Sequence, residues 1–184
     1  MNNKSANTYI RTLYSPGFSC LTMSFWKLNL TLSFNPYIGI DNRGFSKYDL
    51  KTFLSTSVNY EGAAGLCFVA SSIFMGKDAQ KEIGFTLPCS NNATLKFEYK
   101  PDENNQMNAW LIINKNSQTM AFRFPIHEYK AKENGQIITK VVQTGLGSFV
   151  KLLDGYLLEI GGASHLSKLP DEVLDPEMIY APKN

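Results

Sequence analysis

The sequence has only three cysteines and no long hydrophobic segment. Cys20, Cys67 and Cys89 are far apart, odd in number and form no Cys-x-x-Cys pair. This pattern indicates neither a disulfide framework nor a zinc site, and it favours a reducing compartment. No apolar run approaches the roughly 20 residues that a membrane-spanning helix needs. We therefore expect no membrane partner and a cytoplasmic location, with an organelle as the alternative.

Residues that could form a catalytic site are also sparse. The two histidines, His127 and His165, lie far apart in polar stretches. No GxSxG, HExxH, Walker or dinucleotide-binding motif occurs, and we interpret Gly145-Leu146-Gly147 as a packing or helix-start feature. We expect no enzymatic activity, no cofactor and no metal. An active site that pairs His127 with a carboxylate is the alternative.

Acidic residues are unevenly distributed. Residues 1–40 contain none, whereas residues 170–184 contain four acids and one base. Without that acidic tail the chain has 17 bases and 12 acids, against a net charge of +2 for the whole. A basic body with an acidic tail is typical of a polyanion binder whose tail contacts a protein partner or the basic surface. A solvated tail on a neutral protein is the alternative.

The N-terminal residues 1–23 are polar and are interrupted by Ser15-Pro16-Gly17. We interpret them as an arm. An organelle transit peptide is the alternative, because the segment is rich in Ser and Thr and lacks acids. A single domain then covers residues 24–169, followed by the tail over 170–184.

Alternating apolar and polar residues predict strands along this domain. The clearest segment is 26–35, where Leu30, Leu32 and Phe34 fall on one face. Asn134-Gly135 predicts a hairpin turn. The other expected strands cover residues 47–54, 81–87, 94–100, 109–114 and 120–124.

Two segments show helical spacing. Residues 55–75 predict a helix after a Ser/Thr cap, with a buried strand within 66–74 as the alternative. Residues 142–160 predict a second helix that stops at Gly161-Gly162. The predicted fold class is therefore α+β, with antiparallel sheets and two helices, in which a strand-rich unit followed by a helix occurs twice.

The polar faces of the expected strands repeatedly carry cations. Lysines and arginines at sheet spacing can follow a phosphate backbone, and aromatic rings beside them can stack on unpaired bases. Exposed strand lysines also protect sheets from edge pairing, which is the structural alternative. The predicted nucleic-acid-binding residues are Lys27, Lys51, Phe53, Lys96, Lys100, Trp110 and Arg123.

This layout resembles the Whirly-like superfamily of single-stranded DNA binders, which includes positive-cofactor-four-like proteins. The most similar stretches are Leu95-Lys-Phe-Glu-Tyr-Lys-Pro, Ala109-Trp-Leu-Ile-Ile-Asn, Met120-Ala-Phe-Arg-Phe-Pro and the helix over 145–160. The Lys-Gly-Lys-Ala-Ala-Leu signature of plant Whirly proteins is absent, and residues 61–66 read Glu-Gly-Ala-Ala-Gly-Leu instead. The resemblance implies a homo-oligomer, single-strand binding across sheets and no cofactor. A bacteriophage or organellar role fits it, and with that role a location in the cytoplasm of the phage-infected host, at the nucleoid or in an organelle.

The sequence thus predicts a single-stranded nucleic-acid-binding protein that acts in replication, recombination or transcription. Single-stranded DNA is the expected ligand and RNA the alternative. The competing hypothesis is a structural or assembly subunit, for example of a virus, without nucleic-acid chemistry.

Overall fold

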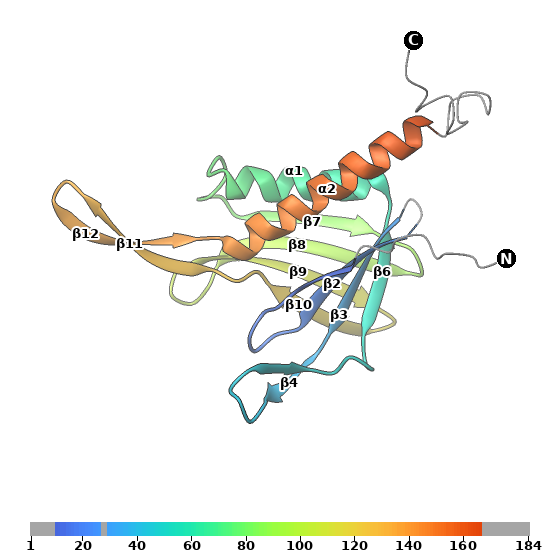
Figure 1. The fold of residues 1–184 in the computed structure, drawn as a ribbon, viewed down its shortest axis with the longest axis horizontal. Coiled ribbons are helices and arrows are strands. Elements are labelled where there is room, and N and C mark those ends of the chain that lie inside the picture. The colour runs from blue at the N-terminus through green and yellow to red at the C-terminus, as the bar shows by residue number, and fades with distance from the viewer. Residues whose placement is uncertain (1–9, 27–28, 167–184) are drawn as a thin grey trace, which may run out of the picture.

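The computed structural model describes the backbone of residues 10–26 and 29–166. The chain has the predicted α+β class, with antiparallel sheets and two helices (Figure 1). Lys27 and the acidic tail lie outside the described residues. No helix in the described part of the chain combines the length and the apolarity needed to cross a membrane.

The first sheet has four antiparallel strands in the order β1-β2-β3-β6. The inward side chains of β2 and β3, such as Leu21, Met23 and Leu32, are completely buried. The strands are β1 (Ile10–Leu13), β2 (Cys20–Trp26), β3 (Asn29–Asn35) and β6 (Leu54–Val58).

The outward face of this first sheet carries hydroxyl groups. Strand registry aligns Thr12, Thr22, Ser33 and Ser55 in one row. A second row contains Ser24, Thr31 and Ser57, in which the Thr31 and Ser57 hydroxyl oxygens lie 3.3 Å apart. This face therefore presents polar but uncharged side chains along its strands.

The second sheet has four antiparallel strands in the order β10-β9-β8-β7. Its inner rows include Phe85, Phe97, Leu111 and Phe122, which are aligned across all four strands. The strands are β7 (Ile83–Pro88), β8 (Ala93–Pro101), β9 (Met107–Lys115) and β10 (Gln118–Arg123).

Two further hairpins extend from this framework. The first pairs β4 (Tyr37–Ile40) with β5 (Ser46–Tyr48). The second pairs β11 (His127–Glu133) with β12 (Gln136–Val142) and projects away from the body (Figure 1). Asn134 and Gly135 both have positive φ, as a tight turn of this kind requires, so the predicted hairpin turn is confirmed.

Two helices cover the inner faces of the sheets. They are α1 (Tyr60–Phe74) and α2 (Thr144–Leu166). Asn59 caps α1 by accepting a hydrogen bond from the Gly62 amide. The Cys67 thiol of α1 donates to Asp154 of α2 at 3.1 Å, and burial together with this carboxylate raises the pKa of the thiol to about 11. Cys67 is therefore a protonated link between the helices at neutral pH.

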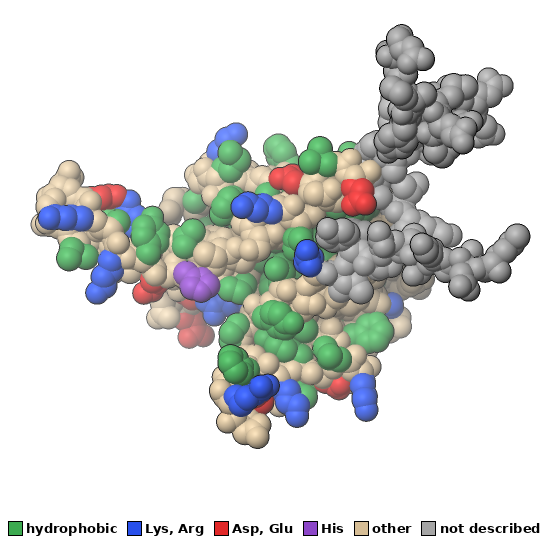
Figure 2. All heavy atoms as spheres, viewed as in Figure 1, with side chains coloured by type: hydrophobic (Ala, Val, Ile, Leu, Met, Phe, Trp, Pro, Cys, Tyr) green, Lys and Arg blue, Asp and Glu red, His purple; other side chains and the backbone are tan. Residues whose placement is uncertain are grey.

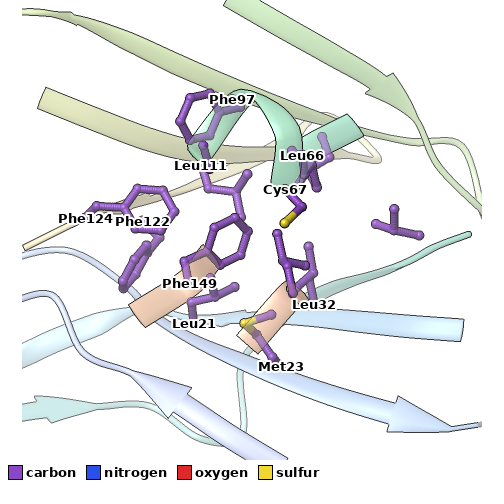
Figure 3. Close-up of a cluster of buried hydrophobic side chains, with 14 of the residues drawn as sticks. Leu21, Met23, Leu32, Leu66, Cys67, Phe97, Leu111, Phe122, Phe124 and Phe149 are labelled. Carbon is purple, nitrogen blue, oxygen red and sulfur yellow. The ribbon is translucent and has the colours of Figure 1, made fainter. Parts of the chain in front are cut away.

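One hydrophobic core joins both sheets and both helices. Figure 3 shows side chains from the two sheets and the two helices pointing toward one another, including Leu32, Leu66, Phe97 and Phe149. Burying a large apolar side chain stabilises a fold by about 1.5–3 kcal/mol. Each sheet and each helix contributes several such residues. The two sheets and the two helices therefore bury their apolar sides against one another.

Several expected boundaries are corrected by the structure. The expected arm over residues 1–23 instead supplies β1 and most of β2, because Leu21 and Met23 fill the core. The expected strand over 47–54 is divided between β5 and β6, with residues 49–53 between them. The first helix begins at Tyr60 because residues 55–58 pair with β3. The second continues past Gly161-Gly162 to Leu166.

The helical glycines allow close packing. A Cβ atom at Gly65 would lie 3.0 Å from the Phe85 ring, and one at Gly147 would lie 2.6 Å from the Phe74 ring. At Gly145 a Cβ would lie 2.3 Å from Pro125 Cδ and 2.6 Å from the Pro125 backbone nitrogen. The interpretation of Gly145 and Gly147 as packing residues is therefore confirmed.

We predict that Gly145→Ala lowers the free energy of unfolding by about 1–3 kcal/mol, because the new methyl group overpacks against the Pro125 backbone. Gly155→Ala in the same helix is the matched control, since nothing lies within 4 Å of its Cβ position. It should raise stability by roughly 0.5–1 kcal/mol through helix propensity alone. Urea denaturation of both variants measures the change in the free energy of unfolding. Equal changes for Gly145→Ala and Gly155→Ala would contradict the packing argument.

Candidate nucleic-acid interface

The outer face of the second sheet is the candidate site. Strand registry aligns Glu98, Trp110 and Arg123 in one row, and Lys96 lies in the next row. Both helices pack against the opposite, inner side, where Gly65 meets Phe85 and Phe149 meets Phe124. The outer face consists of Gly84, Thr86, Thr94, Lys96, Glu98, Lys100, Asn108, Trp110, Ile112, Asn114, Thr119, Ala121 and Arg123.

Four of the seven predicted binding residues lie together on this face: Lys96, Lys100, Trp110 and Arg123. Their shared side follows from the two-residue period of β8, β9 and β10 and from the antiparallel register between them. Lys96 and Lys100 have side chains 43% and 51% exposed, so both are accessible to a ligand.

The remaining predicted residues are not brought to this face. Lys51 and Phe53 are exposed but lie between β5 and β6, on no strand. The Lys51 amide donates to Asp49 in a local turn. The prediction that these two residues face outward from a strand is wrong, because β5 ends at Tyr48. Lys27 lies outside the described residues.

Arg123 is held in place by a network of polar contacts. Its Nε donates to Asn108 Oδ1 at 2.9 Å, and a second guanidinium nitrogen donates to the same oxygen. Asn108 is 1% exposed, and its amide nitrogen donates to Asp102 at 3.0 Å and to the Gln106 carbonyl at 2.7 Å. The buried amide thus fixes the guanidinium before any ligand arrives.

Two aromatic rings complete the environment of Arg123. The guanidinium carbon lies 5.9 Å from the Phe18 ring centroid and 5.8 Å from that of Trp110. The two rings meet edge to face, with centroids 4.9 Å apart. These contacts have the geometry of cation–π interactions. We call Phe18, Asp102, Asn108, Trp110 and Arg123 the Arg123 cluster.

Phe18 and Asn108 were missed by the sequence prediction. Phe18 reaches the face because the β1–β2 loop crosses to the edge strand β10, where the Ser19 amide donates to the Ala121 carbonyl. The sequence offers one indication, since Tyr14 and Phe18 flank a Ser-Pro-Gly turn in an acid-free segment. Asn108 occupies an ordinary strand position, and nothing local distinguishes it.

The charges on the outer face are partly paired. Glu98 lies between Lys96 and Lys100 on β8 and forms ion pairs with both, at 2.8 Å to Lys100. These two lysines, Lys100 most strongly, lower the pKa of the Glu98 carboxyl from its usual 4.5. The glutamate therefore stays ionised and holds the two ammonium groups on the face.

A groove lies beside the face. Its first part, about 460 Å³, lies between the β1–β2 loop and residues 123–127. A second part, about 260 Å³, continues to the start of α2 and shares Tyr14, Pro125 and His127 with the first. We call the two parts together the side groove. Within the described residues, no group of three or more His, Cys, Asp and Glu is placed to hold a metal ion.

The chain was compared with protein-family models, curated proteins and solved structures, and no match was found. The geometry of the site is therefore the basis for a functional assignment.

The ion pairs of Glu98 predict a specific pH dependence. A carboxyl whose pKa is lowered by folding stabilises the protein above its unfolded pKa, and this contribution is lost as pH falls through the folded value. We expect the melting temperature of the wild type to fall more between pH 6 and pH 3 than that of Glu98→Gln. Glu103→Gln, in the exposed β8–β9 turn, is the matched control and should behave like the wild type. Parallel curves for Glu98→Gln and the wild type would contradict the argument.

Proposed function

We propose that this protein binds single-stranded nucleic acid along the outer face of the second sheet, with DNA as the expected ligand and RNA as the alternative. The observation that carries the proposal is the Arg123 cluster, a half-buried guanidinium fixed beside two aromatic rings on the outer face of the sheet. Arginine is suited to phosphate, and aromatic rings stack on bases of any sequence. The two lysines of β8 extend this surface beyond the cluster.

The shape of the surface favours a single strand over a duplex. A duplex reader needs an element that enters a groove, most often a helix with exposed cations. The cations here lie on a sheet instead, where alternate residues of a strand are spaced along one line. The backbone positions of Lys96 and Lys100 are about 13 Å apart along β8 at 3.3 Å per residue, and their ammonium groups converge on the Glu98 carboxylate between them. An extended strand can contact both while its unpaired bases reach Trp110.

Glu98 moderates this electrostatic attraction. It pairs with both lysines in the free protein, so a phosphate that approaches either one meets a partly compensated charge. Removing the glutamate charge therefore should strengthen binding, whereas removing the lysine charges should weaken it. The opposite directions of these two changes allow a sharp test.

The proposal includes the finer expectations of the Whirly-like resemblance. Strands β1–β6 precede α1 and strands β7–β12 precede α2, and this order supports a repeated strand–helix arrangement. On this proposal the protein forms a homo-oligomer and acts in replication, recombination or transcription in the cytoplasm or at the nucleoid. The acidic tail then contacts a protein partner or competes with the strand for the basic face.

We predict that the double variant Lys96→Gln/Lys100→Gln binds single-stranded DNA more weakly and with a smaller salt dependence. Each phosphate contact with a single strand contributes about 0.7 to the slope of log affinity against log salt. The loss of two contacts should therefore reduce the slope by about 1.4. Fluorescence anisotropy with single-stranded DNA, single-stranded RNA and duplex at several salt concentrations measures the effect.

Two control variants separate this site from general charge effects. Lys77→Gln/Lys151→Gln makes the same change in net charge at exposed positions after α1 and on α2. It should leave the salt slope near the wild-type value, while Glu98→Gln should bind more tightly than the wild type. Equal weakening by both double variants would show that the outer face is not the binding site.

A second candidate function is that of an assembly subunit, and one observation favours it. Five large apolar side chains on and after the β4–β5 hairpin are each more than half exposed. They are Ile38, Ile40, Phe45, Leu50 and Phe53, with exposures of 52%, 66%, 65%, 74% and 54%. Figure 2 shows hydrophobic and basic side chains together in the lower part of the molecule, around the β4 hairpin. A second copy of the chain is the occupant we propose for this patch.

Native mass spectrometry tests the assembly function. The wild type should be oligomeric, and Ile40→Lys should shift it toward the monomer because a charge cannot be buried in an apolar contact without a partner. Ile137→Lys, at a position 73% exposed on β12, is the matched control and should not change the mass. Oligomers without oligonucleotide binding would favour the assembly function over the first proposal, and a monomeric wild type would exclude it.

A further inference from the structure

The side groove lies next to the outer face, with which it shares Arg123. The β1–β2 loop forms one wall through Tyr14, Pro16 and Phe18. Pro125 and Ile126, which connect β10 to β11, lie in the opposite wall. The larger part, about 460 Å³, is within the range of about 300–1,000 Å³ found for small-molecule sites. Its walls are mostly apolar, with flat rings that a planar ligand can cover.

The charged side chain in the groove wall is Arg123, and no residue that lines either part is an acid. Arg123 is shared between the groove and the outer face, so an anion bound to it lies at the junction of the two. Its guanidinium has five N–H donors in all. Asn108 Oδ1 accepts two of them, and a terminal nitrogen also forms an ion pair with the Asp102 carboxylate at 3.9 Å. Donors therefore remain for a phosphate group at this end.

His127 lies at the middle of the groove, where its two parts meet. Its Nδ1 is 2.6 Å from the Thr144 hydroxyl oxygen, and that hydroxyl is also 3.2 Å from the Pro125 carbonyl. We assign the hydroxyl proton to the carbonyl, so that Thr144 accepts from Nδ1–H. In the neutral ring Nε2 is then an acceptor. It can accept a hydrogen bond from an N–H group on the edge of a planar ligand.

Tyr14 provides an exposed ring in the same groove as Arg123 and His127. It is 61% exposed and lines both parts of the groove. An aromatic ring with this exposure loses water-accessible surface when a planar heterocycle stacks on it. The ring of Tyr14 can stack on a base, His127 can accept from the edge of that base, and Arg123 can bind a phosphate attached to it. Together they match a nucleotide.

We infer that the side groove binds one nucleotide, with the base stacked on Tyr14 next to His127 and the phosphate on Arg123. This inference rests on the proposed function in one respect, because the nucleotide is taken to belong to the strand that lies on the outer face. The strand then leaves the sheet at Arg123 and inserts one unstacked base beside Pro125. A free nucleoside monophosphate has the same chemistry and can occupy the groove alone.

Saturation-transfer NMR on the full chain tests this inference with thymidine monophosphate as the probe. The nucleotide should bind the wild type, and Tyr14→Ala should weaken it about ten-fold, as expected for the loss of one base–aromatic stack. Tyr129→Ala is the matched control, because Tyr129 is also half exposed, at 49%, but lies on the β11–β12 hairpin. It should leave nucleotide binding unchanged.

Two further probes test whether the Tyr14 end of the groove binds the base and the Arg123 end binds the phosphate. Thymidine without phosphate should bind more weakly than the monophosphate, and Arg123→Gln should remove that difference. Inorganic phosphate alone should bind Tyr14→Ala as well as it binds the wild type. Equal affinity of the wild type and Tyr14→Ala for thymidine monophosphate, or no binding of it at millimolar concentration, overturns the inference.

The lysine variants separate this inference from the proposed function. Lys96→Gln/Lys100→Gln should weaken oligonucleotide binding and leave thymidine monophosphate binding intact, because neither lysine lines the groove. If the monophosphate binds as predicted while oligonucleotide affinity does not respond to the lysines, the proposed function fails and the nucleotide site stands. If oligonucleotides respond to the lysines and the monophosphate does not respond to Tyr14→Ala, the nucleotide site fails alone.

Discussion

The architecture depends on one apolar core that both sheets and both helices share. Phe97 and Phe122 from the second sheet, Leu32 from the first and Phe149 from α2 are completely buried in it. Because each sheet commits one face to this core, the period of two along a strand sends the intervening residues to the opposite side. The polar surface of the second sheet is thus a geometric consequence of its packing. On β8, for example, Lys96 reaches that surface because its neighbours Leu95 and Phe97 are buried.

The Arg123 cluster shows how such a surface acquires a defined chemistry. An arginine on an exposed strand has many side-chain conformations, and ordering it costs entropy when a ligand binds. The Asn108 amide and the rings of Phe18 and Trp110 restrict the guanidinium in the free protein. Asn108 is itself fixed by Asp102 and by the Gln106 carbonyl. A buried, fully bonded amide therefore transmits the rigidity of the β8–β9 turn to the exposed charge.

The sequence was sufficient for the fold class and for the part of the site that lies on regular strands. Lys96, Lys100, Trp110 and Arg123 were predicted correctly to share a face, since alternation and antiparallel pairing follow from local patterns. Lys51 was misplaced because weak alternation continued across the end of β5. Phe18 was not found because its position depends on a loop that meets β10, a contact between residues far apart in the chain. The side groove could not be predicted for the same reason, since its walls are the β1–β2 loop and the connection from β10 to β11, which are far apart in the chain.

The outward faces of the two sheets differ in charge, because the first carries rows of hydroxyl groups and the second carries lysines, a glutamate and an arginine. Thr22, Ser33 and Ser55 can each donate and accept a hydrogen bond, but they carry no charge that a salt solution would screen. On the proposed function, long-range attraction of a polyanion acts through the second sheet, because the hydroxyl rows of the first sheet contain no ionisable side chain. If the proposed function holds, an approaching strand is oriented by this difference before it makes any contact, and the hydroxyl rows keep the same character whatever the ionic strength.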